Sequence, residues 1–109
     1  MHLQFVEKHV QNVPEQPGIF CLWDERYLVY VGRTAPRSHL RGELMHALTM
    51  AMVDDMAVTH FSYEVTATPK TRADEELRRH FEQWGRLPRY NSAPSQHDAW
   101  RGVRTELRR

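Results

Sequence analysis

The sequence predicts an α+β fold in which helices pack on a small, mostly antiparallel sheet of three strands. An apolar run from Gly18, a polar break, and a β-branched and aromatic run ending at Val31 together indicate a hairpin. Alternating apolar and polar residues from 60 to 66 indicate a third strand with one buried face. Two longer segments repeat apolar residues at helical spacing. Three strands form a stable unit only when helices cover them, so these elements belong together.

The length of 109 residues allows one modest core, so we expect a single domain. Within it we expect a core at about 13–91 and a C-terminal tail or helix at 92–109. The apolar share of 40% and the charged share of 27% are typical of globular proteins. With 15 basic and 14 acidic residues, the net charge of +1 does not itself indicate nucleic-acid binding. Any such argument must rest on where the charges lie.

No apolar run reaches the roughly 18 residues of a membrane span, and the first residues lack the basic and apolar segments of a signal peptide. We therefore expect no membrane partner and a cytoplasmic location. The single cysteine, Cys21, agrees with a reducing compartment, because it has no cysteine partner for an internal disulfide or a zinc site.

In the first half of the chain, a short opening helix is predicted by the spacing of Leu3, Val6 and Val10. The prolines and the glycine within 14–18 then indicate a turn before the hairpin, whose strands are expected at 18–23 and 27–31. A loop at 32–39 leads into a second helix. The buried stripe of that helix is expected to comprise Leu40, Leu44, Ala47, Leu48 and Ala51.

In the second half, the buried side of the third strand is expected to carry Phe61, Tyr63 and Val65. Thr71 is expected to cap the next helix and Gly85 to end it. The buried stripe of that helix is expected to comprise Ala73, Leu77, Phe81 and Trp84. Residues 87–91 are expected to be extended because of Pro88, before a terminal helix. The apolar side of the terminal helix is expected to comprise Trp100, Val103 and Leu107.

Two short segments, 13–20 and 30–34, are separated by nine residues and read VPEQPGIF and YVGRT. They resemble the opening of GIY-YIG domains, which are found in repair, homing and restriction nucleases. The similarity extends over about 13–91, where the family continues with an arginine-bearing helix, a third strand, a helix with a metal-binding glutamate, and an asparagine near the end of a P-x-Y-N-like stretch. Each motif alone is short, and their order carries the resemblance.

The resemblance implies that Tyr30 activates the attacking water, as is proposed for the second tyrosine of the family. A free phenol has a pKa of about 10, so this role requires nearby cations, for which Arg33, Arg37 and Arg41 are the candidates. The alternative is that Tyr30 is an aromatic strand residue packed in the sheet. At the first motif tyrosine this chain has Phe20, which keeps the ring and lacks the hydroxyl.

Arg41 is our candidate for the helix arginine, because it follows the loop and could bind a phosphate through two N–H groups. Arg37 competes for this role, since family members more often carry the basic residue about a turn further on, where Glu43 stands. His46 is a candidate for proton transfer, as a family histidine often lies after the arginine. The alternative for His46 is a solvated helix residue.

Glu76 resembles the metal-binding glutamate and would hold Mg²⁺ or Mn²⁺ together with water and phosphate oxygens. Glu75 lies about 100° round the helix, so only one of the two can point at a site. The alternative for both is an exposed, charged helix face. Asn91 is expected either to contact phosphate or to fix the loop that closes the site.

The motif glycines, Gly18 and Gly32, are expected to allow close backbone approach or a sharp turn, or else to be ordinary turn residues. The resemblance as a whole implies a metal-dependent endonuclease, with nucleic acid, expected to be DNA, as its partner. Two arginine clusters, at 33–41 and 101–109, are candidates for phosphate contacts. We expect no separate sequence-reading module, so sequence specificity would need an accessory domain or partner chain.

Two other functions remain open at this stage. The first is a degenerate GIY-YIG-like module that binds nucleic acid or protein without cutting, which the loss of the hydroxyl at Phe20 favours. The second is an oligomerising protein with an exposed methionine surface at residues 45–56, although core packing is the commoner use of methionine.

Overall fold

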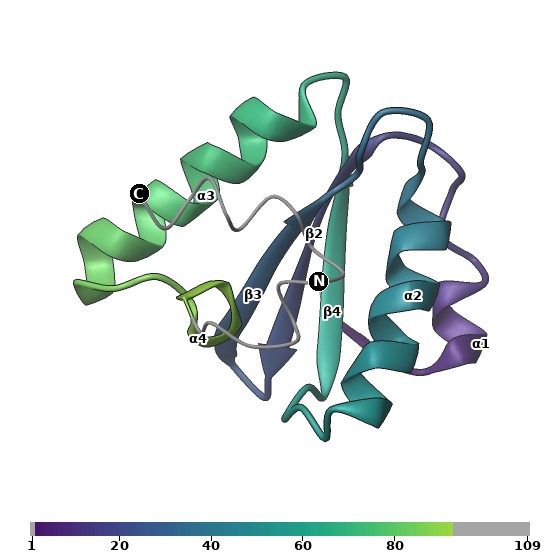
Figure 1. Ribbon diagram of the computed structural model, residues 1–109, viewed down its shortest axis with the longest axis horizontal. Coiled ribbons are helices and arrows are strands. Elements are labelled where there is room, and N and C mark those ends of the chain that lie inside the picture. Colours follow the sequence, from purple (N-terminus) through teal and green to yellow (C-terminus); the bar gives the residue numbers. More distant parts are fainter. Residues whose placement is uncertain (1, 93–109) are drawn as a thin grey trace.

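The computed structural model describes residues 2–92, in which one antiparallel sheet lies between two groups of helices (Figure 1). The helices and strands are β1 (Leu3–Gln4), α1 (Glu7–Val10), β2 (Gly18–Asp24), β3 (Tyr27–Arg33), α2 (Leu40–Val53), β4 (His60–Val65), α3 (Pro69–Trp84) and α4 (Arg89–Ser92). The strand order is β1-β4-β2-β3. The predicted α+β class is confirmed, and the sheet has a fourth strand because β1 pairs with the start of β4.

The predicted hairpin forms as β2 and β3, and β2 is the central strand because β4 pairs with its other edge. Side chains alternate between the two faces of a strand, so Phe20 and Ile19 enter different layers of the molecule. Phe20 faces α1 and α2, whereas Ile19 faces α3. Figure 1 shows this arrangement, with α3 on one side of the sheet and α1 and α2 on the other.

The layer between the sheet and α2 contains the larger apolar cluster. Strand residues Phe20, Leu22, Tyr30 and Phe61 meet the helix stripe there and have no exposed surface. The stripe of α2 is buried as predicted at Leu40, Leu44, Ala47 and Ala51, and Leu48 packs beside it. Burial of this stripe is the main reason that α2 forms on this face.

The layer between the sheet and α3 is thinner. Its buried residues are Ile19, Val31, Ala73 and Leu77. Helix α3 ends at Gly85 as predicted, because this residue adopts a left-handed conformation with φ of 76°. None of the helices in residues 2–92 is both long enough and apolar enough to span a bilayer.

The predicted buried stripe of α3 is wrong at its C-terminal half. Phe81 and Trp84 are each 53% exposed, because no residue of α3 after Leu77 belongs to the apolar cluster of this layer. The predicted buried face of β4 is also wrong beyond Phe61, since Tyr63 and Val65 are exposed.

Three element boundaries differ from the prediction. The spacing of Leu3 suggested a helix, but Leu3 lies in β1, and α1 covers only Glu7–Val10. Helix α3 begins at Pro69, before the predicted cap at Thr71, because proline fits the first helical turn. Residues 89–92 are helical, although an extended segment was expected there. The predicted terminal helix and the arginines at 101–109 lie outside the described residues.

Candidate functional site

Tyr30 lies in the core of the α2 layer. Its side chain has no exposed surface, and its ring centroid is 6.1 Å from that of Phe20. The Phe20 ring in turn covers Gly32, its partner across the hairpin, and a Cβ at Gly32 would overlap that ring. The two aromatic motif positions therefore belong to one packing unit, which needs glycine at position 32.

Gly18 is required for close approach as well. A Cβ there would overlap the Glu64 carbonyl oxygen and the Leu40 side chain. The backbone N–H of Gly18 donates to Thr34 Oγ1 at 3.1 Å, and the N–H of Thr34 donates to the Gly18 carbonyl at 3.0 Å. These contacts join the start of β2 to the end of β3, so both motif glycines act in the scaffold.

The arginines predicted to bind phosphate lie at the far end of β3 and the start of α2. Arg41 donates from Nε to the Val13 carbonyl at 2.8 Å and lies 3.5 Å from a carboxylate oxygen of Glu15. Arg33 is the last residue of β3, and Arg37 is exposed with φ of 69°. Arg41 thus fastens α2 to the segment before β2.

Of the two histidines at α2, one caps the helix and the other is exposed on it. His39 caps the helix, because its Nδ1 accepts from the Gly42 N–H at 3.1 Å. His46 is exposed on α2. Both lie on the α2 side of the sheet.

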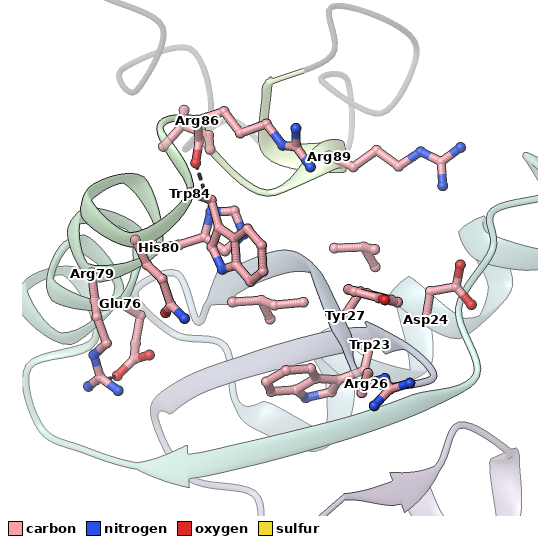
Figure 2. Close-up of a pocket in the computed structure, with 14 residues that line it drawn as sticks. Trp23, Asp24, Arg26, Tyr27, Glu76, Arg79, His80, Trp84, Arg86 and Arg89 are labelled. Atoms are coloured by element: carbon pink, nitrogen blue, oxygen red, sulfur yellow. Dashed lines mark hydrogen bonds and ion pairs between the residues drawn. The ribbon is translucent and has the colours of Figure 1, made fainter.

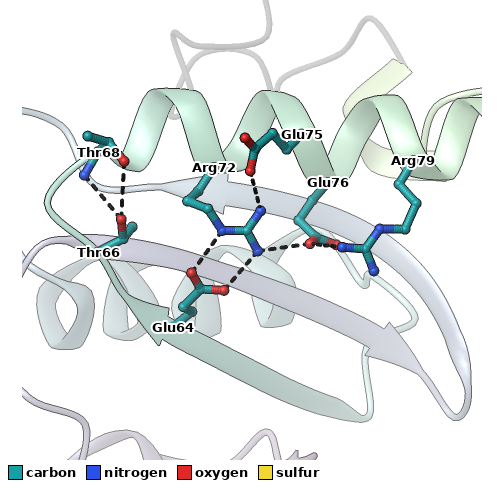
Figure 3. A network of polar contacts seen from close by, with 7 residues as sticks. All are labelled: Glu64, Thr66, Thr68, Arg72, Glu75, Glu76 and Arg79. Carbon is teal, nitrogen blue, oxygen red and sulfur yellow. Dashed lines mark hydrogen bonds and ion pairs between the residues drawn. The ribbon is translucent and has the colours of Figure 1, made fainter.

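Glu76 lies on α3, in a cluster of charges on the opposite side of the sheet (Figure 3). Its Oε2 accepts from Arg72 at 2.9 Å and from Arg79 at 2.8 Å, and its side chain is 17% exposed. Arg72 also donates twice to Glu64, at 2.8 Å each, and once to Glu75 at 2.8 Å. Figure 3 shows Arg72 at the centre of three carboxylates.

The hydrogen bonds from Arg72 lower the pKa of Glu64 from its usual value, and the three carboxylates raise the pKa of Arg72. Beneath this cluster, burial raises the pKa of Cys21 to about 12, and the charge of Glu76 adds to the effect. The raised pKa keeps the Cys21 thiol protonated near neutral pH, which makes it a poor nucleophile.

The expected convergence of Tyr30, Arg41 and Glu76 is not present in the structure. Tyr30 is buried on the α2 face, and Arg41 is bound to the segment before β2. Glu76 belongs to α3, which covers the other face of the sheet. Order along the sequence indicated which elements carry the motifs, but it did not show on which face of the sheet each side chain lies.

Asn91 fixes the segment after α3. Its side chain is fully buried, and its Oδ1 accepts from the Val31 N–H at 2.8 Å while its Nδ2 donates to the Val31 carbonyl at 3.0 Å. These are the bonds that a neighbouring strand would make with the outer edge of β3. Asn91 therefore holds α4 against the outer edge of β3.

A pocket of about 730 Å³ opens between the end of the hairpin and the second half of α3 (Figure 2). Glu76 lines it, whereas Glu75 does not and is 50% exposed. The other charged groups around the pocket are Asp24, Arg26, Arg79, Arg86 and Arg89. Arginines therefore outnumber carboxylates around the pocket, and this balance of charge favours an anion over a cation.

His80 also lines this pocket, one helical turn after Glu76 on the same face of α3. Its Nδ1 is 2.7 Å from the carbonyl oxygen of Arg86. Because a carbonyl can only accept, Nδ1 carries the proton, and in the neutral ring Nε2 keeps its lone pair for a proton or a metal. The Arg86 carbonyl thus fixes the tautomer and the orientation of the His80 ring.

The sequence-based reasoning missed His80, Arg79, Arg86 and Arg89. One signal for them was present, since Glu76, His80 and Trp84 recur every four residues and so share one helix face. Assigning Trp84 to the core hid this pattern. Within the described residues, no group of three or more His, Cys, Asp or Glu side chains is placed to hold a metal ion.

No protein-family model and no curated protein matches this sequence. The structure is similar to the crystal structure of the GIY-YIG N-terminal endonuclease domain of UvrC from Thermotoga maritima, a point mutant bound to its catalytic divalent cation. The TM-score is 0.56 at 17% sequence identity, and the match covers 79% of this chain and 93% of that one. This chain therefore has a GIY-YIG-like fold, as its two opening segments predicted.

Proposed function

We propose that this chain hydrolyses phosphodiester bonds in nucleic acid, with DNA as its substrate, at the pocket beside Glu76. The observation that carries the proposal is a largely buried carboxylate at the wall of an arginine-rich pocket. It is supported by the GIY-YIG-like fold, whose solved neighbour is an endonuclease domain bound to a catalytic divalent cation. Phosphodiester hydrolysis needs these parts: a cation, a proton acceptor and groups that position the phosphate.

Glu76 is the proposed ligand of Mg²⁺ or Mn²⁺. Arg72 and Arg79 both donate to Oε2 of Glu76. Among the described residues, Oε1 accepts no hydrogen bond, so this oxygen is available for a cation. Magnesium often keeps most of its waters and uses few protein ligands, so a single carboxylate fits it. A bound metal would neutralise charge on the phosphate and make water more acidic. The adjacent Arg72 and Arg79 repel a cation, so we expect weak metal binding without substrate.

The other two parts, phosphate positioning and proton acceptance, are assigned to residues of the same pocket. Arg86 and Arg89 are proposed to position the phosphate, because guanidinium groups bind its oxygens in pairs. His80 is proposed to accept the proton of the attacking water at Nε2. Tyr30, Arg41 and His46 lie on the α2 side of the sheet, so the earlier expectation that they act on the same phosphate does not enter this proposal.

A cleavage assay tests the proposal. The substrates are end-labelled single-stranded, duplex and branched DNA and RNA, each with Mg²⁺, Mn²⁺ or EDTA. We expect metal-dependent cutting, slowed roughly 100-fold or more by Glu76→Gln and by His80→Gln. Glu75→Gln is the matched control, because Glu75 is the neighbouring residue, also binds Arg72 and lies outside the pocket. It should cut within about threefold of wild type. An equal loss in Glu75→Gln and Glu76→Gln would contradict the site.

The second candidate is a GIY-YIG-like module that binds nucleic acid or a protein without cutting. It is favoured by Phe20 in place of the first motif tyrosine and by the full burial of Tyr30. The same assay separates the two functions. Binding that is equal in wild type and Glu76→Gln, with no product under any metal, would support the module and exclude the hydrolase.

A further inference from the structure

The pocket beside Glu76 carries aromatic rings as well as arginines, and hydrolysis alone does not explain the rings. Three of them line it: Trp23 at the end of β2, Tyr27 at the start of β3, and Trp84 in the last turn of α3. Figure 2 shows Tyr27 and Trp23 on the hairpin side and Trp84 on the helix side. The pocket is thus bounded by rings on two sides.

Two of these rings are unusually exposed for their size. Tyr27 is 60% exposed and Trp84 is 53% exposed, whereas large aromatic side chains usually bury most of their surface. Trp23 is held in place, because its Nε1 donates to Ser62 Oγ at 3.0 Å. Exposed rings that face a pocket mark a binding surface for a flat, apolar group.

The charges around these rings favour an anionic ligand. Arg26 lies over the Tyr27 ring with 6.0 Å between its guanidinium carbon and the ring centroid, so a cation and a ring occur side by side. Arg86 and Arg89 follow α3 along the same pocket. A ligand with flat rings joined by phosphates satisfies both features, and nucleic acid is such a ligand.

The base faces of a duplex are covered by stacking, whereas unpaired bases can splay out onto aromatic side chains. The volume of about 730 Å³ lies within the range of pockets that enclose small ligands, so the pocket can admit a single nucleotide. We propose that this pocket binds unpaired nucleotides, with a base stacked on Trp84 and phosphates on the arginines. The inference names the substrate class of the proposed function and rests on it.

The test is binding of fluorescein-labelled 12-nucleotide single strands of DNA or RNA, and of a blunt DNA duplex, measured by anisotropy in EDTA. We expect the single strands to bind at least about tenfold more tightly than the duplex. Trp84→Ala should weaken single-strand binding about 5- to 100-fold, the range for loss of one stacked base. Trp84→Phe should restore most of the affinity, because it keeps a ring.

Phe81→Ala is the matched control. Phe81 lies on the same helix and is 53% exposed like Trp84, but it does not line the pocket. Its substitution should change the dissociation constant by less than about twofold. Equal losses in Phe81→Ala and Trp84→Ala, or a duplex that binds as tightly as the single strands, would overturn the inference. Tyr27→Ala provides a second test on the opposite wall if Trp84→Ala does not fold.

The outcome is independent of catalysis because no metal is present. Single-strand binding that needs Trp84, without cutting in Mg²⁺ or Mn²⁺, would support this inference and contradict the hydrolase. Cutting of duplex DNA by a protein that binds no single strand would support the hydrolase and overturn the inference. DNA and RNA strands that bind equally would show that the pocket does not sense the 2′-hydroxyl.

Discussion

The two faces of the sheet differ in what they do with the residues of the motifs. On the α2 face, Phe20, Tyr30 and Gly32 fit together in the core, and Tyr30 has no exposed surface. On the α3 face, the apolar cluster is small, and charged and aromatic side chains gather around a pocket. In this chain the motif residues most visible in the sequence pack inside the α2 layer, whereas the residues of the proposed site lie on the α3 face.

The largest expected effect tests the packing of the α2 face. Gly32→Ala should destabilise the fold by about 3 kcal/mol, because its Cβ would overlap the Phe20 ring in a core that cannot expand cheaply. Urea unfolding followed by circular dichroism measures this. Combining Gly32→Ala with Phe20→Leu should recover at least about 1 kcal/mol relative to the sum of the single changes, since the smaller side chain removes the overlap.

Gly42→Ala is the control for this substitution. Gly42 lies on the exposed side of α2, where the nearest atom to an added Cβ is at 3.2 Å and belongs to the His39 ring. Alanine also favours the helix, so the free energy of unfolding should change by no more than about 1 kcal/mol. Additive effects of Gly32→Ala and Phe20→Leu would contradict the proposed packing unit.

The α2 face of the sheet could be predicted from the sequence more fully than the α3 face. The hairpin was predictable from two apolar, β-branched and aromatic runs on either side of a polar break, and α2 was predictable from apolar residues at helical spacing. The exposure of Trp84 could not be predicted. Helical spacing of apolar residues does not show whether the sheet extends far enough to cover the last turn of the helix. The pocket was missed for the same reason, since it lies where the apolar layer under α3 ends near Leu77.

A smaller effect is expected at Tyr30, and it decides which face carries the chemistry. Tyr30→Phe removes only the hydroxyl of a fully buried ring, so stability should fall by about 1 kcal/mol. Nucleic-acid cutting by the folded protein should stay within about threefold of wild type, while Glu76→Gln loses it. Single-turnover rates at saturating protein measure the difference, with unfolding curves to show that each variant is folded.

The opposite result at Tyr30 would move the active site to the α2 face. A loss of roughly 100-fold in Tyr30→Phe with unchanged stability would mean that the buried ring reaches substrate after a rearrangement. In that case Arg41 and His46 would become the groups to test next, as the resemblance to GIY-YIG domains implied. The sequence alone could not show which face of the sheet Tyr30 occupies. Adjacent strand residues such as Tyr30 and Val31 point to opposite faces, and each face is covered by a helix.

The smallest expected effect concerns the charge cluster on the α3 face. Arg72 lowers the pKa of Glu64, so the folded state binds a proton at Glu64 less readily than the unfolded state. The stabilisation is therefore present above the carboxylate's unfolded pKa of about 4.3 and is lost as the pH falls further. Arg72→Gln should lower stability at pH 7 and have less effect near pH 3. Because Glu64 and Glu75 are about half exposed, the difference should stay below about 1 kcal/mol and shrink in high salt.

Urea unfolding at the two pH values in low salt measures this difference, and Lys70→Gln is its control. Lys70 lies 3.5 Å from Asp74 in an exposed pair one helical turn apart, so its loss should have a smaller effect than the loss of Arg72. Arg72→Gln also removes one of the two cations that repel a metal at Glu76, so Mn²⁺ should bind the variant more tightly without substrate. An equal destabilisation by Arg72→Gln at pH 7 and pH 3 would mean that Arg72 acts through the packing of its stem rather than through its charge.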